Sequence, residues 1–398
     1  MTIGERRLRV LHVGKFYPPS RGGMERVVQV LCEAERASVD SQALVANDSP
    51  RTVHELINGV PVTRVAALAR VGAVAVCPTF PWWFRKLTSD VVVVHEPNPL
   101  AIVAHALVRP RSRLLVWIHA EVVRPQWRYK AFYRPFLRRV LSLADRIIVA
   151  SPPMRDLAEE LRDFRDKVVV IPYAIDPDQH ALTPACGQLV EQIRGPRATP
   201  LVLFVGRMVP YKGVDVLLRA LKDVEARAIL VGSGPLKATW EALAAELGLS
   251  ERVEFVGEVD QPRLTALYRA CDVFVLPSVT RAEAFGMVQL EAMACGKPVI
   301  STLLPSGVPW VNRDGETGLV VPPCDVEALR LALHTLLSDP ALRSAMGERG
   351  RARVVAEFSL ERMAAQTTTL YRSLVGQPSV AGDGLVAEAA HVEAQRQS

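Results

Sequence analysis

Short apolar runs alternate with amphipathic segments along almost the whole chain, and this alternation restricts the possible folds more than any other feature. The runs are nearly continuous in Val, Leu and Ile, as expected of strands buried on both faces. A first series of expected strands covers residues 8–13, 42–46, 91–95, 114–119, 146–150 and 168–171. A second covers residues 201–205, 228–231, 253–256, 273–276, 298–301 and 318–321. The pattern predicts an α/β protein with parallel sheets, built as two successive Rossmann-like domains.

The two series are separated by a proline-rich stretch, which sets the expected domain boundaries. Residues 173–200 contain many of these prolines and little periodicity, so they are expected to connect the domains. The first domain then spans residues 1–172 and the second 201–358. Residues 376–398 are rich in Gly, Ala and polar side chains, which predicts a disordered tail.

Composition narrows the class of protein. Six cysteines are scattered without any C-x-x-C spacing, which favours reduced thiols in a cytoplasmic protein over disulfides or zinc ligands. The first residues lack the apolar core of a secretory signal, and no apolar stretch is long enough for a membrane span. The net charge of +6 indicates an anionic partner: nucleic acid, a nucleotide or an acidic membrane surface.

Loops that follow strands of a doubly wound sheet are the expected ligand-binding positions. Gly22 and Gly23 follow the first strand and open a helix, an arrangement that suits either a phosphate or a tight turn requiring positive φ. His119 ends its strand, where a histidine can donate to a sugar hydroxyl, shuttle a proton or serve a structural role.

The second domain carries sharper signals in its first loop. Gly206 and Arg207 follow a strand, and Lys212 stands five residues after Arg207. Arginine binds phosphate oxygens as a planar fork and lysine as a point charge, so this loop is a candidate diphosphate clamp. An ordinary solvated basic loop is the alternative.

A further signal is a pair of glutamates around a helix start. Glu283 precedes the expected helix and Glu291 lies within it, a separation of roughly 12 Å. Between them, the backbone N–H groups of Phe285, Gly286 and Met287 form an expected anion site. The pair could therefore hold the two ends of one ligand with a central phosphate, although two solvated glutamates on an amphipathic helix would give the same pattern.

Taken together and in this order, the motifs resemble the retaining glycosyltransferase family 4, also called glycosyltransferase group 1, whose members adopt the GT-B fold. The resemblance covers nearly the whole chain and rests on Gly22-Gly23, His119, Gly206-Arg207, Lys212-Gly213, Val231-Gly232-Ser233-Gly234-Pro235, and Glu283 with Glu291. The chain departs from the family where Tyr173-Ala174 replaces a common Asn-Gly, and where Ser233 replaces a frequent acidic residue.

The resemblance implies a nucleotide-sugar donor bound between two Rossmann-like domains that face each other across a cleft, with the helix at 359–375 crossing back to the first domain. Its implied catalytic residues are His119, Arg207, Lys212 and Glu283. Its implied donor-binding residues are Gly22, Gly23, Gly206, Phe285, Gly286, Met287 and Glu291. Arg207 and Lys212 would hold the diphosphate, Glu291 the ribose, and Glu283 with the backbone of 285–287 the transferred sugar.

Residues 304–318 are similar to bacterial polysaccharide mannosyltransferases, which favours GDP-mannose over a UDP-sugar as donor. A departing diphosphate needs mainly positive charge, so no metal or other cofactor is expected. Retention is compatible with a front-face route or with double displacement. The expected product belongs to a surface polysaccharide or glycolipid.

Two segments in the first domain, 81–86 and 124–139, mix Trp, Tyr and Phe with Arg and Lys. This mixture suits a lipid-linked acceptor at the inner face of the cytoplasmic membrane, single-stranded nucleic acid, or a helix with its aromatics packed inward. With a transferase, the membrane interpretation is preferred and nucleic acid is not an expected partner. A sugar-nucleotide epimerase and a basic nucleic-acid-binding module remain alternative functions.

Overall fold

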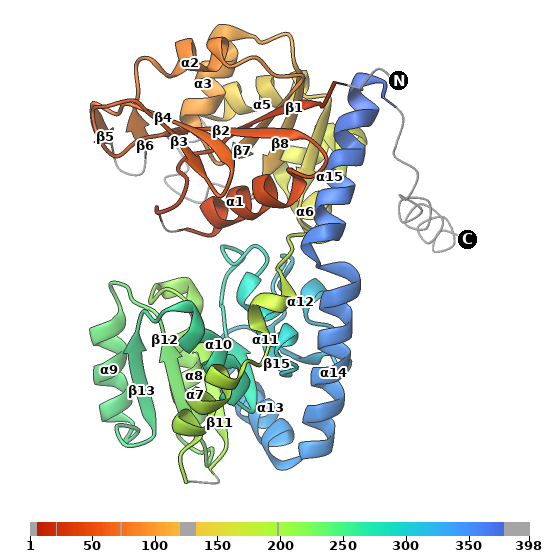
Figure 1. Ribbon diagram of the computed structural model, residues 1–398. Coiled ribbons are helices and arrows are strands. Elements are labelled where there is room, and N and C mark those ends of the chain that lie inside the picture. Colours follow the sequence, from red (N-terminus) through yellow and green to blue (C-terminus); the bar gives the residue numbers. More distant parts are fainter. Residues whose placement is uncertain (1–5, 21, 72–73, 120–132, 197–198, 378–398) are drawn as a thin grey trace. The chain divides into compact units, whose positions relative to one another are not determined.

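The computed structural model describes residues 6–20, 22–71, 74–119, 133–196 and 199–377. The chain divides into two compact units (Figure 1): unit 1 is Met1–Tyr173 with Leu360–Ser398, and unit 2 is Ala174–Ser359. Both are α/β units with mainly parallel sheets, as the alternating pattern predicts. Every helix in the described residues is too short or too polar to cross a lipid bilayer.

Unit 1 contains a twisted eight-stranded sheet in the order β10-β9-β8-β7-β1-β2-β4-β3. Its strands are β1 Arg9–Val13, β2 Asp40–Ala46, β3 Val53–Ile57, β4 Val60–Val65, β7 Val91–Glu96, β8 Arg113–Ile118, β9 Arg146–Val149 and β10 Val168–Val170. Strand β3 pairs antiparallel with β4, whereas the other neighbours pair in parallel. A separate hairpin is formed by β5 Ala69–Val71 and β6 Val74–Val76.

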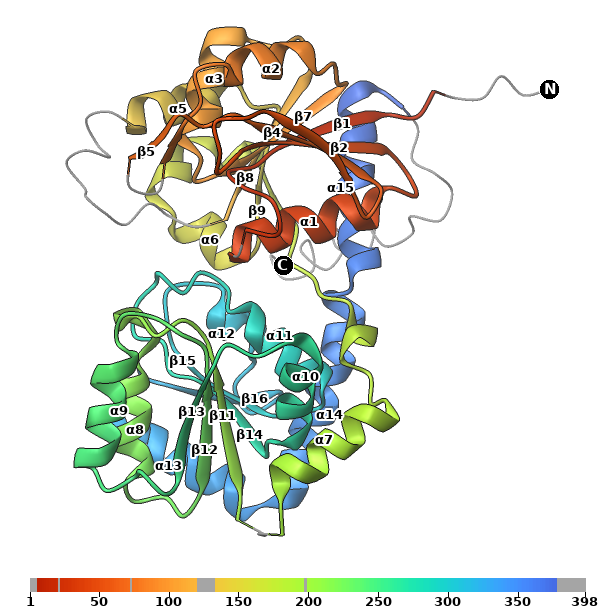
Figure 2. The same cartoon turned by 60° about the vertical axis from the view of Figure 1, so that its left-hand side comes forward.

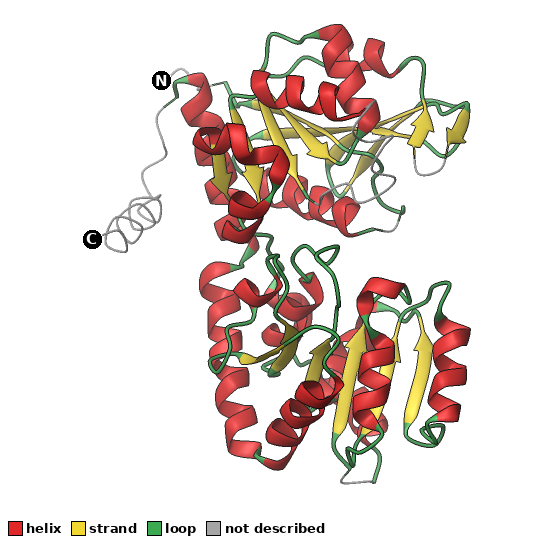
Figure 3. Ribbon diagram, turned by 180° about the vertical axis from the view of Figure 1, so that it is seen from behind, coloured by secondary structure: helices red, strands yellow, loops and turns green. Residues whose placement is uncertain are grey.

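Helices lie on both faces of the unit 1 sheet (Figures 1 and 3). They are α1 Gly23–Glu35, α2 Phe80–Lys86, α3 Pro99–Val108, α5 Arg134–Leu143, α6 Pro152–Leu157, the 3₁₀ segment η2 Glu159–Lys167, and α15 Leu360–Val375. Helix α15 packs against α1, so this helix belongs to the unit formed by the first residues. Of the predicted tail, only residues 376 and 377 fall within the described residues.

Unit 2 contains a six-stranded parallel sheet in the order β13-β12-β11-β14-β15-β16. Its strands are β11 Leu201–Val205, β12 Arg227–Val231, β13 Val253–Gly257, β14 Val273–Leu276, β15 Val299–Thr302 and β16 Gly318–Val321. Its helices are α7 Pro184–Arg194, α8 Val214–Leu221, α9 Lys237–Glu246, α10 Gln261–Ala270, α11 Met287–Ala294, α12 Val308–Val311, α13 Val326–Ser338 and α14 Pro340–Glu357. Two 3₁₀ segments are η3 Pro177–His180 and η4 Pro210–Lys212.

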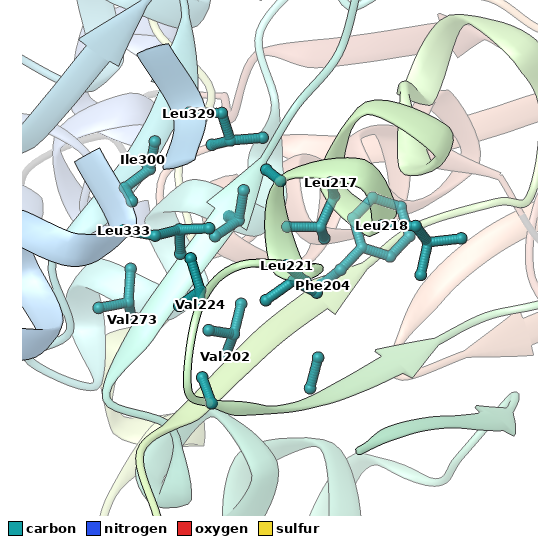
Figure 4. Close-up of a cluster of buried hydrophobic side chains, with 14 of the residues drawn as sticks. Val202, Phe204, Leu217, Leu218, Leu221, Val224, Val273, Ile300, Leu329 and Leu333 are labelled. Carbon is teal, nitrogen blue, oxygen red and sulfur yellow. The ribbon is translucent and has the colours of Figure 1, made fainter. Parts of the chain in front are cut away.

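The core of unit 2 explains why its strands read as continuous apolar runs. Helices α8, α9 and α13 cover one face of the sheet, and α7, α10, α11 and α14 cover the other (Figure 2). All five residues of β11 are buried. Val202 and Phe204 of β11 pack with Leu217 of α8 and Leu333 of α13 (Figure 4). A strand between two helix layers has no polar face, so it lacks the alternation of an exposed strand.

Residues 173–200, the expected connector between the domains, contain regular structure. It carries η3 and helix α7, and α7 packs against α10 within unit 2. Pro184 occupies the first turn of α7, where a missing N–H costs no hydrogen bond, and the Thr183 hydroxyl accepts a bond from the N–H of Cys186. Proline here marks a helix start and not a linker.

Candidate active site

The site is built around the place where the strand order of unit 2 reverses. Strand β11 continues to β12 on one side, while its other neighbour, β14, begins the series that continues to β16. Loops after two such strands leave in opposite directions and open a ligand-binding crevice at the carboxyl edge. Lys212 comes from the loop after β11 and Glu283 from the loop after β14, and their Nζ and Oε2 atoms are 2.5 Å apart.

The Lys212–Glu283 ion pair is nearly enclosed. Lys212 is 7% exposed and Glu283 8% exposed. The Ser278 hydroxyl donates to the same Oε2 of Glu283 at 2.9 Å. Both bonds therefore go to one carboxylate oxygen, while a lysine ammonium has three N–H donors and uses one for Glu283. Because both charges are largely desolvated, each depends on the other for stabilisation.

Two glycines allow the loops at this edge to approach closely. Gly213 has φ +63°, and a Cβ there would lie 2.1 Å from the carbonyl oxygen of Pro277 in the loop after β14. Gly232 has φ +125°, and a Cβ there would lie 2.0 Å from the carbonyl oxygen of Gly206. The Gly-x-Gly after β12 thus serves loop-to-loop packing, which explains its incomplete likeness to a dinucleotide fingerprint.

Arg207 differs from Lys212 although both lie on the same loop. Met208 is fully buried and its N–H donates to the carbonyl of Ser233 at 2.8 Å. This anchoring leaves the Arg207 side chain exposed beside the buried residue. The predicted clamp therefore consists of one exposed guanidinium and one buried, ion-paired ammonium.

Helix α11 begins at the same edge with its first amides uncapped by any side chain. Gly286 is the N-cap residue, with φ +76°. The side chain of Phe285 is 2% exposed and packs between the rings of Trp310 and Phe358, with centroid distances of 6.2 and 6.1 Å. Phe285 thus anchors the helix start, and the backbone of residues 285–287 remains the candidate anion-binding element.

Glu291 lies within α11 and is oriented by a residue that sequence reasoning missed. The hydroxyl of Tyr268, on α10, donates to Glu291 Oε2 at 2.7 Å. Tyr268 is fully buried, and burial followed by the nearby Glu291 charge raises its pKa. The phenol therefore stays protonated and acts as a donor. Since this contact depends on how α10 packs on α11, no spacing in the sequence predicts it.

Gly22 and Gly23 form the start of α1 in unit 1. Gly22 has φ 175°, an extended conformation open to any residue, and Gly23 is not among the residues with positive φ. The tight-turn explanation for these glycines is therefore wrong. A Cβ at Gly22 would contact the carboxylate of Glu25, and one at Gly23 would have no atom within 4 Å.

His119 follows β8 and is 7% exposed. Its Nε2 lies 2.8 Å from Nδ1 of His95, and its Nδ1 lies 2.7 Å from the hydroxyl of Tyr173. Burial lowers the pKa of His119 to about 3, so the ring is neutral. The candidate sugar-binding histidine therefore belongs to a buried hydrogen-bonded chain, and its partners His95 and Tyr173 were not predicted.

The aromatic and basic segments of unit 1 separate into two environments. On α2, Trp82 is 55% exposed and the ammonium of Lys86 lies 4.8 Å from its ring centre. On α5, Leu137, Val140 and Leu141 are buried, while Arg134 and Arg138 pair with Glu159 and Asp163 of η2. Helix α5 thus has an apolar face turned inward and cations on its polar face. Trp127, Arg128 and Lys130 lie outside the described residues.

Within the described ranges, no three His, Cys, Asp or Glu side chains converge as metal ligands would. All six cysteines are free thiols, five of them buried.

Two family models match the chain. One described as glycosyl transferases group 1 matches residues 189–353, and one described as glycosyl transferase 4-like domain matches residues 22–174. The D-rhamnosyltransferase WbpZ of Pseudomonas aeruginosa is 36% identical over 87% of this chain and 91% of its own length. The O-antigen chain mannosyltransferase C of Escherichia coli is 30% identical over 94% of this chain and all of its own length.

A third relative is named for its donor. The GDP-mannose-dependent alpha-(1-6)-phosphatidylinositol monomannoside mannosyltransferase of Mycolicibacterium smegmatis is 33% identical over 64% of this chain and 68% of its own length. Among solved structures, sucrose-phosphate synthase from Thermosynechococcus elongatus has a TM-score of 0.77 and 26% identity, covering 93% of this chain and all of its own. Anabaena HepE in complex with UDP-glucose has a TM-score of 0.74 and 20% identity, covering 92% of this chain and all of its own.

Proposed function

The chain belongs to the group 1 glycosyltransferases of family 4 and is a hexosyltransferase of GT-B fold, and we propose that it transfers mannose from GDP-mannose to a glycan or lipid-linked acceptor with retention of configuration. The acceptor would belong to surface polysaccharide or glycolipid biosynthesis. The observation that carries this proposal is the Lys212–Glu283 pair at the strand-order reversal, beside Arg207 and the start of α11. The name of the mycobacterial relative supports GDP-mannose, and a UDP-sugar is the alternative donor.

Stabilisation of the departing diphosphate would come from three positive groups. Arg207 offers an exposed guanidinium fork, Lys212 offers the N–H donors that Glu283 does not use, and the first amides of α11 add the positive end of the helix. Removing a single donor of this kind from an active site commonly costs about 3 kcal/mol of transition-state stabilisation. These three groups would let the transferase work without a metal ion.

The carboxylates suit binding of the sugar hydroxyls. Glu291 is held by Tyr268 for the ribose, and Glu283 keeps its second oxygen, Oε1, for the transferred sugar. The ammonium and the hydroxyl that donate to Glu283 partly neutralise the negative charge of its carboxylate, which weakens the whole group as a nucleophile. This arrangement favours a front-face route, in which the leaving phosphate accepts the proton of the acceptor, over double displacement. In unit 1, no atom lies within 4 Å of a Cβ placed at Gly23, which leaves room for a ligand there. Gly22 and Gly23 therefore remain candidates for donor binding.

Thermal unfolding with a panel of GDP-, UDP-, ADP- and dTDP-sugars tests the donor. A ligand at about 100 times its dissociation constant stabilises the folded state by roughly 2.7 kcal/mol, so GDP-mannose is expected to raise the Tm most. EDTA should change neither this shift nor the transfer rate. A larger Tm shift with a UDP-sugar would identify that sugar nucleotide as the donor in place of GDP-mannose. Activity that EDTA abolishes and manganese restores would contradict metal independence.

Two further measurements distinguish the alternative functions: conversion of the nucleotide sugar without an acceptor, and RNA binding at several salt concentrations. An epimerase would convert the nucleotide sugar without an acceptor. A nucleic-acid-binding module would show steeply salt-dependent RNA binding and no stabilisation by any nucleotide sugar.

Peripheral binding to an anionic membrane forms a further part of the proposal, and the exposed residues of α2 support it. Trp82 is exposed, and Arg85 and Lys86 are exposed beside it. Tryptophan favours the headgroup boundary, and each cation near an anionic bilayer contributes about 1 kcal/mol. On α5, by contrast, Arg134 and Arg138 already have carboxylate partners.

Removal of the two α2 cations should therefore weaken vesicle binding. For Arg85→Gln with Lys86→Gln, we expect the partition coefficient onto vesicles containing anionic lipid to fall roughly 30-fold at low salt, from about 2 kcal/mol of lost attraction. A matched variant, Arg134→Gln with Arg138→Gln, removes equal charge and should have a much smaller effect. Equal binding by the original protein and the α2 variant in co-sedimentation would exclude this membrane surface.

A further inference from the structure

A chain of five buried polar side chains crosses the core of unit 1. Glu35 Oε1, on α1, lies 2.6 Å from Nε2 of His12, on β1. His12 Nδ1 lies 3.0 Å from Nε2 of His95, on β7. His95 Nδ1 lies 2.8 Å from Nε2 of His119, and His119 Nδ1 lies 2.7 Å from the hydroxyl of Tyr173. Glu35, His12 and His95 are 0% exposed, so water does not compete for these bonds.

The sheet itself creates this chain. Strands β1, β7 and β8 are neighbours, and His12 pairs in register with Val93, two residues before His95. His95 in turn pairs with Trp117, two residues before His119. A step of two keeps the side chains on one face, so the imidazoles form a diagonal across three strands. Their rings stack, with centroids 5.3 Å apart for His12–His95 and 5.1 Å apart for His95–His119.

Hydrogen-bond chemistry allows the chain one direction while Glu35 is ionised and His12 is a neutral imidazole. A carboxylate only accepts, and Glu35 Oε1 also accepts from the hydroxyl of Ser41 at 2.5 Å. His12 must then carry its proton on Nε2, and a neutral imidazole has only one N–H. His12 Nδ1 consequently accepts from His95 Nε2–H. Because His95 also has only one N–H, its Nδ1 must accept from His119 Nε2–H.

The Glu35 carboxylate at one end of the hydrogen-bonded chain therefore determines the tautomer of His119 at the other. His119 carries its proton on Nε2, and its Nδ1 accepts from the Tyr173 hydroxyl at 2.7 Å, a shorter contact than the 3.4 Å between that hydroxyl and the His119 carbonyl oxygen. Burial lowers the pKa of His95 and of His119, so neither ring competes for a second proton. The other titratable groups beside Glu35 are Cys32 and Tyr371, whose pKa values burial raises, so both stay neutral.

We propose that Glu35, His12 and His95 are positioning residues of the transferase, which hold His119 as the neutral Nε2–H tautomer with Nδ1 presented as a hydrogen-bond acceptor. This inference rests on the proposed role of His119 in sugar transfer. His119 then receives a hydrogen bond from a hydroxyl, that of Tyr173 or of a sugar, and does not donate one through Nδ1. This role differs from the simpler expectation that His119 donates to a sugar hydroxyl.

Histidine tautomers can be measured directly. In full-length protein labelled with ¹⁵N-histidine, long-range ¹H–¹⁵N correlation spectra should show His12, His95 and His119 as neutral Nε2–H tautomers at neutral pH. Glu35→Gln should disturb this pattern, because a carboxamide can donate as well as accept and so permits both directions of the chain. We expect mixed tautomers at His119 and a kcat lower by roughly 10- to 100-fold, by analogy with partners that orient metal-binding histidines, with the KM for the nucleotide sugar unchanged.

His105→Gln is a matched control. His105 is a buried histidine on α3, outside the chain, so its replacement should leave the tautomers and the turnover unchanged. An Nδ1–H or doubly protonated His119 in the original protein would overturn the tautomer assignment whatever the activity. Normal turnover in Glu35→Gln with altered tautomers would overturn the positioning role. Failure of the proposed function would appear separately, as the absence of stabilisation by any nucleotide sugar.

Discussion

Arg207→Ala is expected to lower kcat by about 100-fold or more while leaving the free energy of unfolding within about 0.5 kcal/mol of its original value. Arg207 is exposed, so its removal leaves no buried group without a partner. In the proposed mechanism its guanidinium stabilises negative charge that develops on the diphosphate during transfer. The loss should therefore fall on kcat and kcat/KM together. Steady-state transfer assays and urea unfolding measure the two quantities.

Arg351→Ala provides the matched control, because Arg351 is also an exposed arginine of unit 2 but lies on α14. It removes the same charge and should change neither kcat nor stability. If Arg207→Ala is folded and transfers sugar at the original rate, the assignment of Arg207 to the leaving group fails. An equal loss in both variants would instead indicate an effect of net charge.

Most strands of the two sheets could be predicted, because burial on both faces produces a continuous apolar run in the sequence. The expected run at 201–205 is β11, and that at 91–95 lies within β7. Strands β3, β4, β5 and β6 were not predicted. Strand β3 has no buried residue and β6 has only Ala75 buried, whereas β4 is mostly buried but Pro61, Thr63 and Arg64 interrupt its apolar run. Where tertiary burial does not impose a pattern, local composition alone does not identify a strand.

Candidate site residues could be selected from the sequence, but the contacts between them could not. Arg207, Lys212 and Glu283 follow strands, where an α/β fold binds ligands, so their candidacy needs no structure. The contact between Lys212 and Glu283 joins residues 71 positions apart and exists because β11 and β14 are neighbours. Strand order is not encoded in any local window. The histidine chain depends on strand order and register together, which is why His119 was considered alone.

The Lys212–Glu283 pair leads to the largest expected effect on stability. Lys212→Met leaves the Glu283 carboxylate buried without its cation, and Glu283→Gln leaves the Lys212 ammonium buried without its anion. Breaking a buried ion pair from one side costs roughly 3–5 kcal/mol. Each single variant should therefore lower the Tm of the transition that includes unit 2 by roughly 10 °C.

The double variant distinguishes a structural pair from a functional one. Lys212→Met with Glu283→Gln places two neutral side chains of similar size together, so it should recover most of the lost stability. It should not recover turnover, because the cation for the diphosphate and the carboxylate for the sugar are both gone. A double variant as unstable as the sum of the two single variants would show that the charges are not coupled. A stable double variant with normal transfer activity would show that the pair only joins the loops after β11 and β14, and the catalytic assignment of both residues would be lost.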